Sequence, residues 1–454
     1  MPVTLSYDSE SRLTISGLSC DCPLPHQQPT QDIYVGTSLV QRIPALIARR
    51  KMGTHCVLVA DRNTYKVAGE SVEHALTASG ITVTRCLIER EGDMEPNEQA
   101  CGEVLLSVEP ETEFLIAVGS GSITDTVRVN ARRCGLPFVS VGTAPSMDGY
   151  TSVIAPLLLK GAKIHRAGPC PEIIVCDTDV LRTAPDAMIA SGVGDVLGKY
   201  IAKADWKLGR IINDEPYCEI CGEIVTDAIE KLMDNVKEIK KKTEKGIRIL
   251  IEGLLLAGVT ILISGETRAV GSVEHNITHY WEMQQLKRVR KEPPHGASVG
   301  VATLMLWPLY MRFADEDLSS LDMERIRARR MGREARKAWV IKAYGSTMAE
   351  IILRENPEDF LTWEEQERRV RRAQARMGEI RQVLAELPSF DRVVAAMRIL
   401  GAPMCAADVG VGEEVRNMAM HCGKDYRSRY SLMKLIDECG LEEKYLSAYP
   451  VAGQ

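Results

Sequence analysis

Short apolar runs rich in β-branched residues alternate with amphipathic segments along the first part of the chain. The apolar runs have the length of buried strands and span residues 56–60, 81–88, 114–118, 138–141 and 173–176. The amphipathic segments have the spacing of helices and span residues 38–51, 66–79, 96–107 and 123–134. This alternation indicates a parallel sheet with crossover helices. We therefore predict an α/β domain over residues 1–180.

The pattern changes after Thr183, where strand-like segments nearly vanish. Charged segments with apolar residues at three- and four-residue spacing follow, among them 237–248, 324–337 and 364–381. This spacing predicts amphipathic helices with solvated outer faces. We therefore predict an all-α domain over residues 181–454. A cleft between the two domains is then the expected place for a ligand.

Charge and hydropathy narrow the classes of protein that remain. The 454 residues include 56 Lys and Arg against 62 Asp and Glu, a net charge of −6 that argues against nucleic acid as a partner. Charged residues at the start of the chain, Asp8, Glu10 and Arg12, exclude a secretory signal. The longest apolar stretch, 249–263, contains Glu252 and is shorter than the ~20 residues of a membrane span. We predict a buried core helix there, no membrane span, and a cytoplasmic protein.

The 13 cysteines are expected to be reduced thiols. Cys218 and Cys221 form the only C-x-x-C motif, and a zinc ribbon needs a second pair. We therefore predict two ordinary thiols on a helix.

A glycine-containing loop follows the predicted strand 114–118. It consists of Gly119, Ser120, Gly121, Ser122 and Ile123. Glycines let the backbone approach a phosphate, and the start of the following helix offers free N–H groups. Thr124 stands where the third glycine of the dinucleotide fingerprint would be, so this loop alone is structural as often as functional.

Two further loops follow predicted strands. Asp61 ends the strand 56–60, where its carboxylate serves either an adenosine ribose or, as we favour without other evidence, a helix N-cap. The segment from Thr143 to Asp148 follows the strand 138–141. Carboxyl ends of parallel strands share one edge, so all three loops are expected to converge in a Rossmann-like nucleotide site.

Histidines cluster in the second half of the chain. His275, His279 and His295 fall within 21 residues, although the chain has only 8 histidines. His275 and His279 are four residues apart and share one face of a predicted helix. Asp195 lies between glycines in an apolar segment. Such ligands suit zinc, nickel or ferrous iron, and three of them leave a position open for substrate. Histidines in ordinary hydrogen bonds explain the cluster equally well.

Several motifs together resemble the sn-glycerol-1-phosphate dehydrogenase family, in its bacterial branch encoded within arabinose operons. That family lies within the group of iron-type alcohol dehydrogenases and dehydroquinate synthases. The matching motifs, in the order of the family, are VGSGSI at 118–123, TAPSMDGYTS at 143–152, GDVLGK at 194–199, ADW at 204–206, EHNITH at 274–279 and HG at 295–296. The last ~130 residues match only loosely.

The resemblance implies a dehydroquinate synthase-like fold and a set of site residues. The implied metal ligands are Asp195, His275 and His295. The implied catalytic and substrate residues are Asp148, Asp195 and His279. The implied contacts to a nicotinamide cofactor are Asp61, Gly119, Ser120, Gly121, Ser122, Ile123, Thr143, Ala144, Pro145, Ser146 and Ser152. The chain departs from the branch at Asn276, where a histidine is usual, and at residues 268–273, where a proline and a Ser-Gly pair are usual.

We therefore predict a metal-dependent oxidoreductase that interconverts dihydroxyacetone phosphate and sn-glycerol 1-phosphate with NAD or NADP. The expected metal is one divalent ion, for which zinc or nickel is favoured over iron. The resemblance to the family also suggests a homo-oligomer. Asp61 favours NAD, whereas Arg62 beside it suits the additional phosphate of NADP. The alternatives are a glycerol or other polyol dehydrogenase and a non-catalytic binding protein. Dehydroquinate synthase is disfavoured because the first metal ligand in that family is typically a glutamate, whereas this chain offers Asp195.

Overall fold

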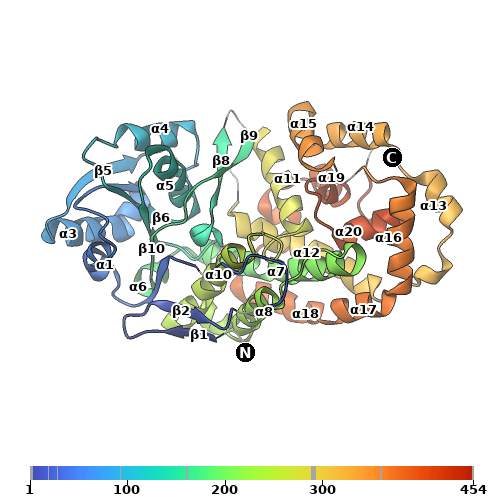
Figure 1. The fold of residues 1–454 in the computed structure, drawn as a ribbon, viewed down its shortest axis with the longest axis horizontal. Helices are drawn as coiled ribbons and strands as arrows, with labels where there is room; N and C mark the ends of the chain where they lie inside the picture. The colour runs from blue at the N-terminus through green and yellow to red at the C-terminus, as the bar shows by residue number, and fades with distance from the viewer. Residues whose placement is uncertain are drawn as a thin grey trace.

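The computed structural model describes residues 4–18, 20–27, 29–90, 92, 94–159, 162–287, 293–357 and 360–451. A sheet with its covering helices lies beside a larger body of helices (Figure 1). The last strand of the sheet ends at Asp177, and within the described residues only helices and loops follow. The division at residue 180 into two separate domains remains a prediction.

The sheet has six parallel strands in the order β3-β10-β7-β6-β4-β5. Their bounds are Asp32–Gly36 (β3), His55–Asp61 (β4), Thr82–Ile88 (β5), Phe114–Gly119 (β6), Phe138–Gly142 (β7) and Ile173–Asp177 (β10). The five strands predicted from apolar runs are confirmed. The prediction missed β3, because Asp32 and Gly36 at its ends leave only three apolar residues between them.

Helices cover both faces of the sheet. One face packs against α1 (Ile43–Arg50) and α3 (Glu70–Ala78), and the other against α4 (Glu98–Leu106) and α5 (Gly121–Cys134). Side chains of β4 alternate accordingly, with Leu58 on the first face and Val57 and Val59 on the second. Burial on both faces explains the continuous apolar runs of the sequence. Short helical segments complete this part: η1 (Val40–Arg42), α2 (Arg62–Thr64) and η2 (Tyr65–Gly69).

Two antiparallel hairpins were not predicted from the sequence. The first pairs β1 (Thr4–Tyr7) with β2 (Leu13–Ser16), and its apolar side chains pack against the core of the helical body. The second pairs β8 (Ile154–Leu159) with β9 (Ala162–Ala167) after the turn η3 (Gly149–Thr151). It packs on α5 and reaches α11 (Val273–Lys287), so it stands between the two parts (Figure 1).

Helices form the rest of the chain, as the sequence predicted. The inner ones are α6 (Thr178–Leu181), α7 (Asp186–Asn213), α8 (Glu219–Asp234), α9 (Val236–Lys240), α10 (Glu244–Ser264), α11 and α12 (His295–Phe313). The outer ones are η4 (Leu318–Ser320), α13 (Met323–Arg329), α14 (Arg333–Tyr344), α15 (Ser346–Glu355), α16 (Trp363–Ala375), α17 (Met377–Ala385), α18 (Phe390–Leu400), η6 (Ala406–Val409), α19 (Glu413–Cys422), η7 (Gly423–Asp425), α20 (Leu432–Glu438) and α21 (Glu442–Leu446).

Helix α10 is long and apolar enough to cross a membrane by length and composition alone. However, 83% of its most apolar stretch is buried inside the protein. The prediction of a core helix is therefore confirmed, and among the described residues no other helix passes the same test.

Glycines allow α7 to approach its neighbours closely. A Cβ at Gly194 would overlap the carbonyl oxygen of Gly296 on α12, and a Cβ at Gly192 would overlap that of Pro145. The bare backbone of α7 is therefore in contact with both α12 and the loop after β7. Asp195 directly follows Gly194 and is thereby placed next to both elements.

Candidate active site

The loops at the carboxyl edge of the sheet meet where the direction of its connections reverses. From β4 the chain moves outward to β5, and it then returns past β4 to β6. The ends of the adjacent strands β4 and β6 therefore flank a crevice of the kind that binds ligands in open α/β sheets. Asp61 ends β4 and Gly119 ends β6, so the structure brings these two predicted cofactor residues together.

The start of α5 is open for an anion. Its N-cap residue, Ser120, makes no side-chain hydrogen bond to the helix, so the first N–H groups are not capped by it. A Cβ at Gly121 would meet only the side chain of Met147, at 3.2 Å. These groups, with Ser122 and Ile123 in the first turn, fit the pyrophosphate of a nicotinamide cofactor.

Asp61 is an N-cap in this structure, as the residue pattern alone favoured. One carboxylate oxygen, Oδ1, accepts hydrogen bonds from the backbone of Asn63 and Thr64, both at 2.8 Å. The bonds to the helix use only this oxygen. Arg62 is exposed, with 3.5 Å between its guanidinium and Glu89.

The loop after β7 connects the cofactor edge to the helical body. Thr143 donates its backbone N–H to the carbonyl of Gly119, at 3.2 Å, and Ser146 accepts a bond from the Ser191 hydroxyl of α7, at 2.9 Å. The carbonyl of Ala144, next to Pro145, accepts from Tyr150 at 2.7 Å. Farther along, the Ser152 hydroxyl donates to the carbonyl of Ile154, at 2.8 Å. Residues 143–146 therefore lie against the glycine loop. The Ser152 hydroxyl, in contrast, is hydrogen-bonded within its own turn.

The three predicted metal ligands come from three different helices. Asp195 lies on α7, His275 on α11 and His295 at the start of α12. One donor atom from each lies within 4.8 Å of the others, and Asp195 is fully buried.

Glutamates orient both imidazoles of this group. His275 Nδ1 lies 2.8 Å from Glu274, and His295 Nδ1 lies 2.7 Å from Glu282. Each histidine then has Nε2 left for a metal, and the Nε2 of His275 lies 3.5 Å from Asp195 Oδ1. Carboxylates behind metal-bound histidines are the usual second layer of such sites. The residues therefore fit a divalent ion with two imidazoles and one carboxylate.

Lys199 links the two aspartates of the site. Its ammonium lies 2.7 Å from Asp195 Oδ1 and 2.6 Å from Asp148 Oδ2. Burial opposes ionisation of Asp195, but Lys199 and the two nearby imidazoles hold its pKa below the usual range. The backbone N–H of Asp148 also donates to Asp195 Oδ2, at 3.0 Å.

His279 lies beside the predicted ligands but with different partners. Its Nδ1 is 2.9 Å from Glu282 Oε2, and its ring stacks on that of His295 with centroids 5.4 Å apart. Burial lowers the pKa of His279 well below its usual value, and the bond to Glu282 offsets this only in part. A donor atom of His279 also lies within 4.8 Å of Glu282 and His295, so proximity alone does not separate ligand from neighbour.

Several residues of the site were missed from the sequence. Glu282 accepts bonds from His279, His295 and Lys163 of β9, the last at 2.8 Å. A glutamate three residues after a histidine was the available signal, but it also matches a solvated helix face. His165 of β9 lies 5.4 Å from His279 between ring centroids, and Lys163 and His165 occupy an unpredicted hairpin.

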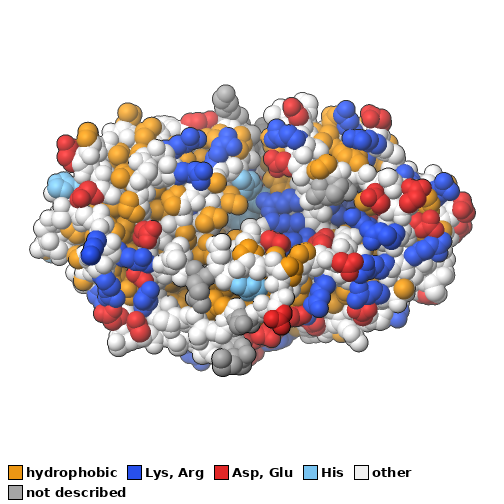
Figure 2. Space-filling model, in the orientation of Figure 1, with side chains coloured by type: hydrophobic (Ala, Val, Ile, Leu, Met, Phe, Trp, Pro, Cys, Tyr) orange, Lys and Arg blue, Asp and Glu red, His pale blue; other side chains and the backbone are white. Residues whose placement is uncertain are grey.

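The C-terminal segment, whose sequence matched the family loosely, also reaches the site. The ring of Tyr426 lies 5.7 Å from that of His279, and the neighbouring Arg427 acts electrostatically on His165. Arg429 donates to the carbonyls of Thr267 (3.2 Å) and Gly271 (2.7 Å) and so holds the loop before α11. In Figure 2 the surface is hollowed between the two parts, and Lys and Arg side chains gather on the helical side of the hollow.

The arrangement of sheet and helices is that of iron-containing alcohol dehydrogenases. The model of the family described as iron-containing alcohol dehydrogenase matches residues 34–185. The glycerol dehydrogenase from Schizosaccharomyces pombe superposes with a TM-score of 0.58 at 15% identity, over 94% of this chain and 92% of that one. The maleylacetate reductase from Rhizobium sp. strain MTP-10005 gives 0.58 at 15% identity, over 94% and 99%. These likenesses confirm the predicted fold.

Sequence similarity identifies the family more narrowly. Three relatives bear the name glycerol-1-phosphate dehydrogenase [NAD(P)+]. That from Halalkalibacterium halodurans is 35% identical over 67% of this chain and 77% of its own length. Those from Geobacillus thermodenitrificans and Bacillus subtilis are 30% and 39% identical, over 91% and 59% of this chain and 94% and 69% of their own lengths. The chain belongs to the glycerol-1-phosphate dehydrogenase family.

Proposed function

We propose that this protein is a metal-dependent oxidoreductase that interconverts dihydroxyacetone phosphate and sn-glycerol 1-phosphate with NAD(P)(H). One observation carries the proposal. The backbone N–H of Asp148, in the loop that follows the cofactor edge, donates to the buried carboxylate of Asp195 at 3.0 Å. A cofactor at the sheet edge and a metal at Asp195, His275 and His295 would therefore face the same substrate.

A divalent ion held by Asp195, His275 and His295 supplies a Lewis acid that polarises the ketone oxygen and stabilises negative charge on it. Zinc and nickel suit this donor set best. Lys199 lies between Asp195 and Asp148 and offsets part of their combined negative charge. Asp148 is thereby fixed at the substrate side of the site.

We assign proton transfer to His279. With Nδ1 bonded to Glu282, the neutral ring has Nε2 free to accept the hydroxyl proton when the alcohol is oxidised. Glu282 then stabilises the imidazolium that results. In the reduction His279 would return the same proton to the substrate oxygen, and a bound nicotinamide would supply the hydride for the carbonyl carbon.

The phosphate of the substrate is expected near β9 and the C-terminal segment. Burial, together with the charges of Arg427 and Lys163, lowers the pKa of His165 to about 4, so cationic side chains surround this neutral ring. Lys163 already pairs with Glu282, whereas Arg427 lies over the ring of Tyr426, 5.5 Å from its centroid. We propose Arg427 as the principal phosphate contact.

The test compares dihydroxyacetone phosphate with dihydroxyacetone in the metal-loaded enzyme, with NADH and with NADPH. We expect kcat/KM to be far higher for the phosphorylated ketone. The substitution Arg427→Ala should raise KM for that substrate and leave reduction of dihydroxyacetone unchanged. Equal kcat/KM for both ketones would instead indicate a polyol dehydrogenase, and no turnover would indicate a binding protein.

The remaining assignments are also proposals. Asp61 retains Oδ2 outside its capping bonds, and Arg62 is exposed beside it, so we propose that either NAD or NADP is accepted. None of the 13 cysteines, all of which lie among the described residues, is in a disulfide, which supports a reducing cytoplasmic environment. We propose a homo-oligomer on the basis of the family resemblance, which size-exclusion chromatography with light scattering can test.

A further inference from the structure

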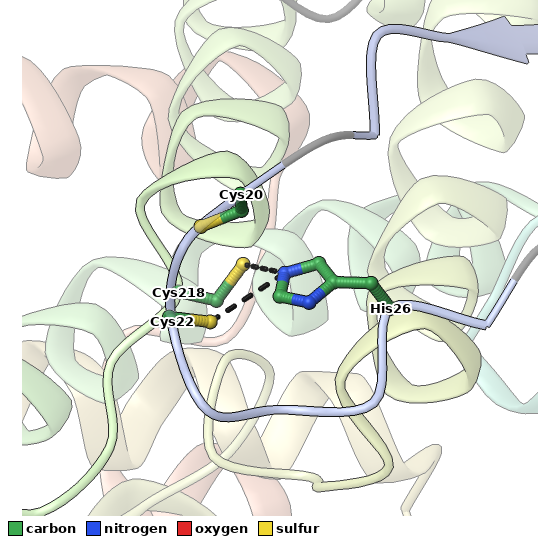
Figure 3. A group of neighbouring side chains, drawn as sticks. All are labelled: Cys20, Cys22, His26 and Cys218. Atoms are coloured by element: carbon green, nitrogen blue, oxygen red, sulfur yellow. Dashed lines mark hydrogen bonds between the residues drawn. The ribbon is translucent and has the colours of Figure 1, made fainter.

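A second group of potential metal ligands lies outside the active site. It consists of Cys20, Cys22, His26 and Cys218, and one donor atom from each lies within 4.8 Å of the others (Figure 3). The first three residues lie on the segment between β2 and β3, and Cys218 is the N-cap residue of α8. None of these residues contributes to the active site described above.

The distances within this group resemble those of a tetrahedral zinc site. His26 Nε2 lies 3.1 Å from Cys218 Sγ and 3.5 Å from Cys22 Sγ. With Zn–S near ~2.3 Å and Zn–N near ~2.0 Å, a tetrahedron places nitrogen and sulfur about 3.5 Å apart. A metal ion therefore needs only small movements of these side chains.

The imidazole of His26 is oriented for ligation. Its Nδ1 lies 2.8 Å from the carbonyl oxygen of Leu24, so this nitrogen carries the proton and donates it there. Nε2 then has its lone pair directed toward the sulfur atoms, which Figure 3 shows on the same side of the ring. A backbone carbonyl in this position is a common second-layer partner of zinc-bound histidine.

The segment presents these side chains to the body of the protein by simple alternation. Cys20, Cys22 and His26 are half-buried, whereas the intervening Asp21, Pro23, Pro25 and Gln27 are exposed. The segment is anchored next to the cluster, since the backbone N–H of Gln27 donates to the carbonyl of Ile263, the penultimate residue of α10, at 3.2 Å.

Cys221, the other half of the C-x-x-C motif, has a different role. Its thiol is buried within α8 and contacts the carbonyl oxygen of Thr260, at 3.8 Å. The prediction of an ordinary helix thiol therefore holds for Cys221. Cys218 differs from Cys221 in having partners from a segment about 190 residues away in the chain.

We propose that Cys20, Cys22, His26 and Cys218 bind one zinc ion in a structural site. Three sulfurs and one imidazole nitrogen form a closed set with no position for substrate, as in structural zinc sites. The three thiols release their protons when the ion binds, which leaves a net charge of −1 on the centre. The ion fastens the segment that leads into β3 to the start of α8, and so joins the edge of the sheet to the helical body.

The test uses full-length protein purified under reducing conditions without chelator and reconstituted with Co²⁺. Thiolate ligands give cobalt an intense charge-transfer band in the near ultraviolet, which the nitrogen and oxygen ligands of the active site do not give. We expect this band in the wild-type protein and in His275→Ala, and its loss in Cys22→Ser and Cys218→Ser. The matched control is Cys221→Ser, which removes a buried thiol one helical turn away and should retain the band.

Zinc analysis provides a second measurement on the same proteins. Cys22→Ser and Cys218→Ser should each contain about one zinc ion per chain less than Cys221→Ser. Limited proteolysis should also cleave the segment 20–31 faster in these two variants and in chelator-treated wild type. Absence of the thiolate band in reduced wild-type protein overturns the proposal, as does a band that persists in both variants. Neither result bears on the proposed catalytic activity, which is assayed separately.

Discussion

Glu282 bonds two histidines of the proposed active site, the metal ligand His295 and the proton-transfer residue His279. Its substitution by glutamine therefore tests both roles. The carboxylate bonds His295 through Oε1 at 2.7 Å and His279 through Oε2 at 2.9 Å. It also pairs with Lys163 at 2.8 Å. Glutamine keeps the shape of the side chain but has one acceptor oxygen and no charge. One of the two imidazoles therefore loses its partner and meets an N–H donor instead.

The expected effects on metal affinity and on the catalytic rate differ in size. Loss of a carboxylate behind a metal-bound histidine typically weakens metal binding about 10- to 100-fold, or roughly 1.4–2.7 kcal/mol. Loss of a positioned acid–base group lowers the rate by about 10²–10⁴. We therefore expect Glu282→Gln to show both defects. His279→Ala should show only the second, a lower kcat/KM with its metal retained.

The assay combines a competitive chelator titration for metal affinity with kcat/KM for dihydroxyacetone phosphate at saturating metal. Glu252→Gln is the matched control, because Glu252 is also buried but its carboxylate pairs with Lys231 of α8, at 2.7 Å. Metal binding by Glu282→Gln as tight as that of wild type would show that Glu282 does not support a metal-bound imidazole. A metal-free His279→Ala would show that His279 is a ligand, and a fully active one that the proton follows another route.

Three more substitutions probe the metal site, the glycine loop and a buried carboxyl group. His275→Ala, which removes one proposed metal ligand, should be folded but lack active-site metal and activity. Full metal content, measured by mass spectrometry, would show that His275 is not a metal ligand. Gly121→Val should remain folded, because its side chain would meet only the flexible Met147, but it should lose cofactor affinity, because the side chain takes the space of the pyrophosphate. The control, Gly102→Ala on α4, should bind NADH normally in a fluorescence titration. Equal NADH affinities of the two variants would contradict a role of the loop in cofactor binding. Burial raises the pKa of Asp205 to about 7, so the folded protein holds a proton that the unfolded chain releases near pH 4. The free energy of unfolding should therefore fall by up to about 1.4 kcal/mol per pH unit between these values, and urea titrations at pH 5 and pH 7 should show that Asp205→Asn lacks this part of the slope.

The sheet was predictable because its strands are buried on both faces. Continuous apolar runs separated by amphipathic segments specify such strands, and the positions of Asp61 and Gly119 at strand ends followed directly. The hairpin β8–β9 was not predictable in this way, since Pro156 interrupts its first strand and Lys163, His165 and Arg166 occupy its second. Its role depends on contacts with α11 that local patterns do not encode.

The residue pattern left the proximity of Asp195, His275 and His295 open, the family resemblance favoured it, and the structure gives its physical basis. The glycines around Asp195 let α7 meet α12 at backbone distance, which no periodicity reveals. The cysteine cluster was missed because its members lie far apart in the sequence. Cys20 and Cys22 form a C-x-C pair near the start of the chain, whereas Cys218 follows about 190 residues later, and the spacing of paired C-x-x-C motifs does not reveal such a combination.

The proposed site catalyses hydride transfer to dihydroxyacetone phosphate with a defined stereochemistry. The most direct measurement incubates the zinc- or nickel-loaded enzyme with that ketone and NADH or NADPH, and determines the configuration of the product. We predict that the cofactor is oxidised and that the product is sn-glycerol 1-phosphate, which an enzyme specific for sn-glycerol 3-phosphate does not consume. Formation of the sn-3 enantiomer, or no cofactor oxidation by metal-loaded enzyme, would exclude the proposed activity.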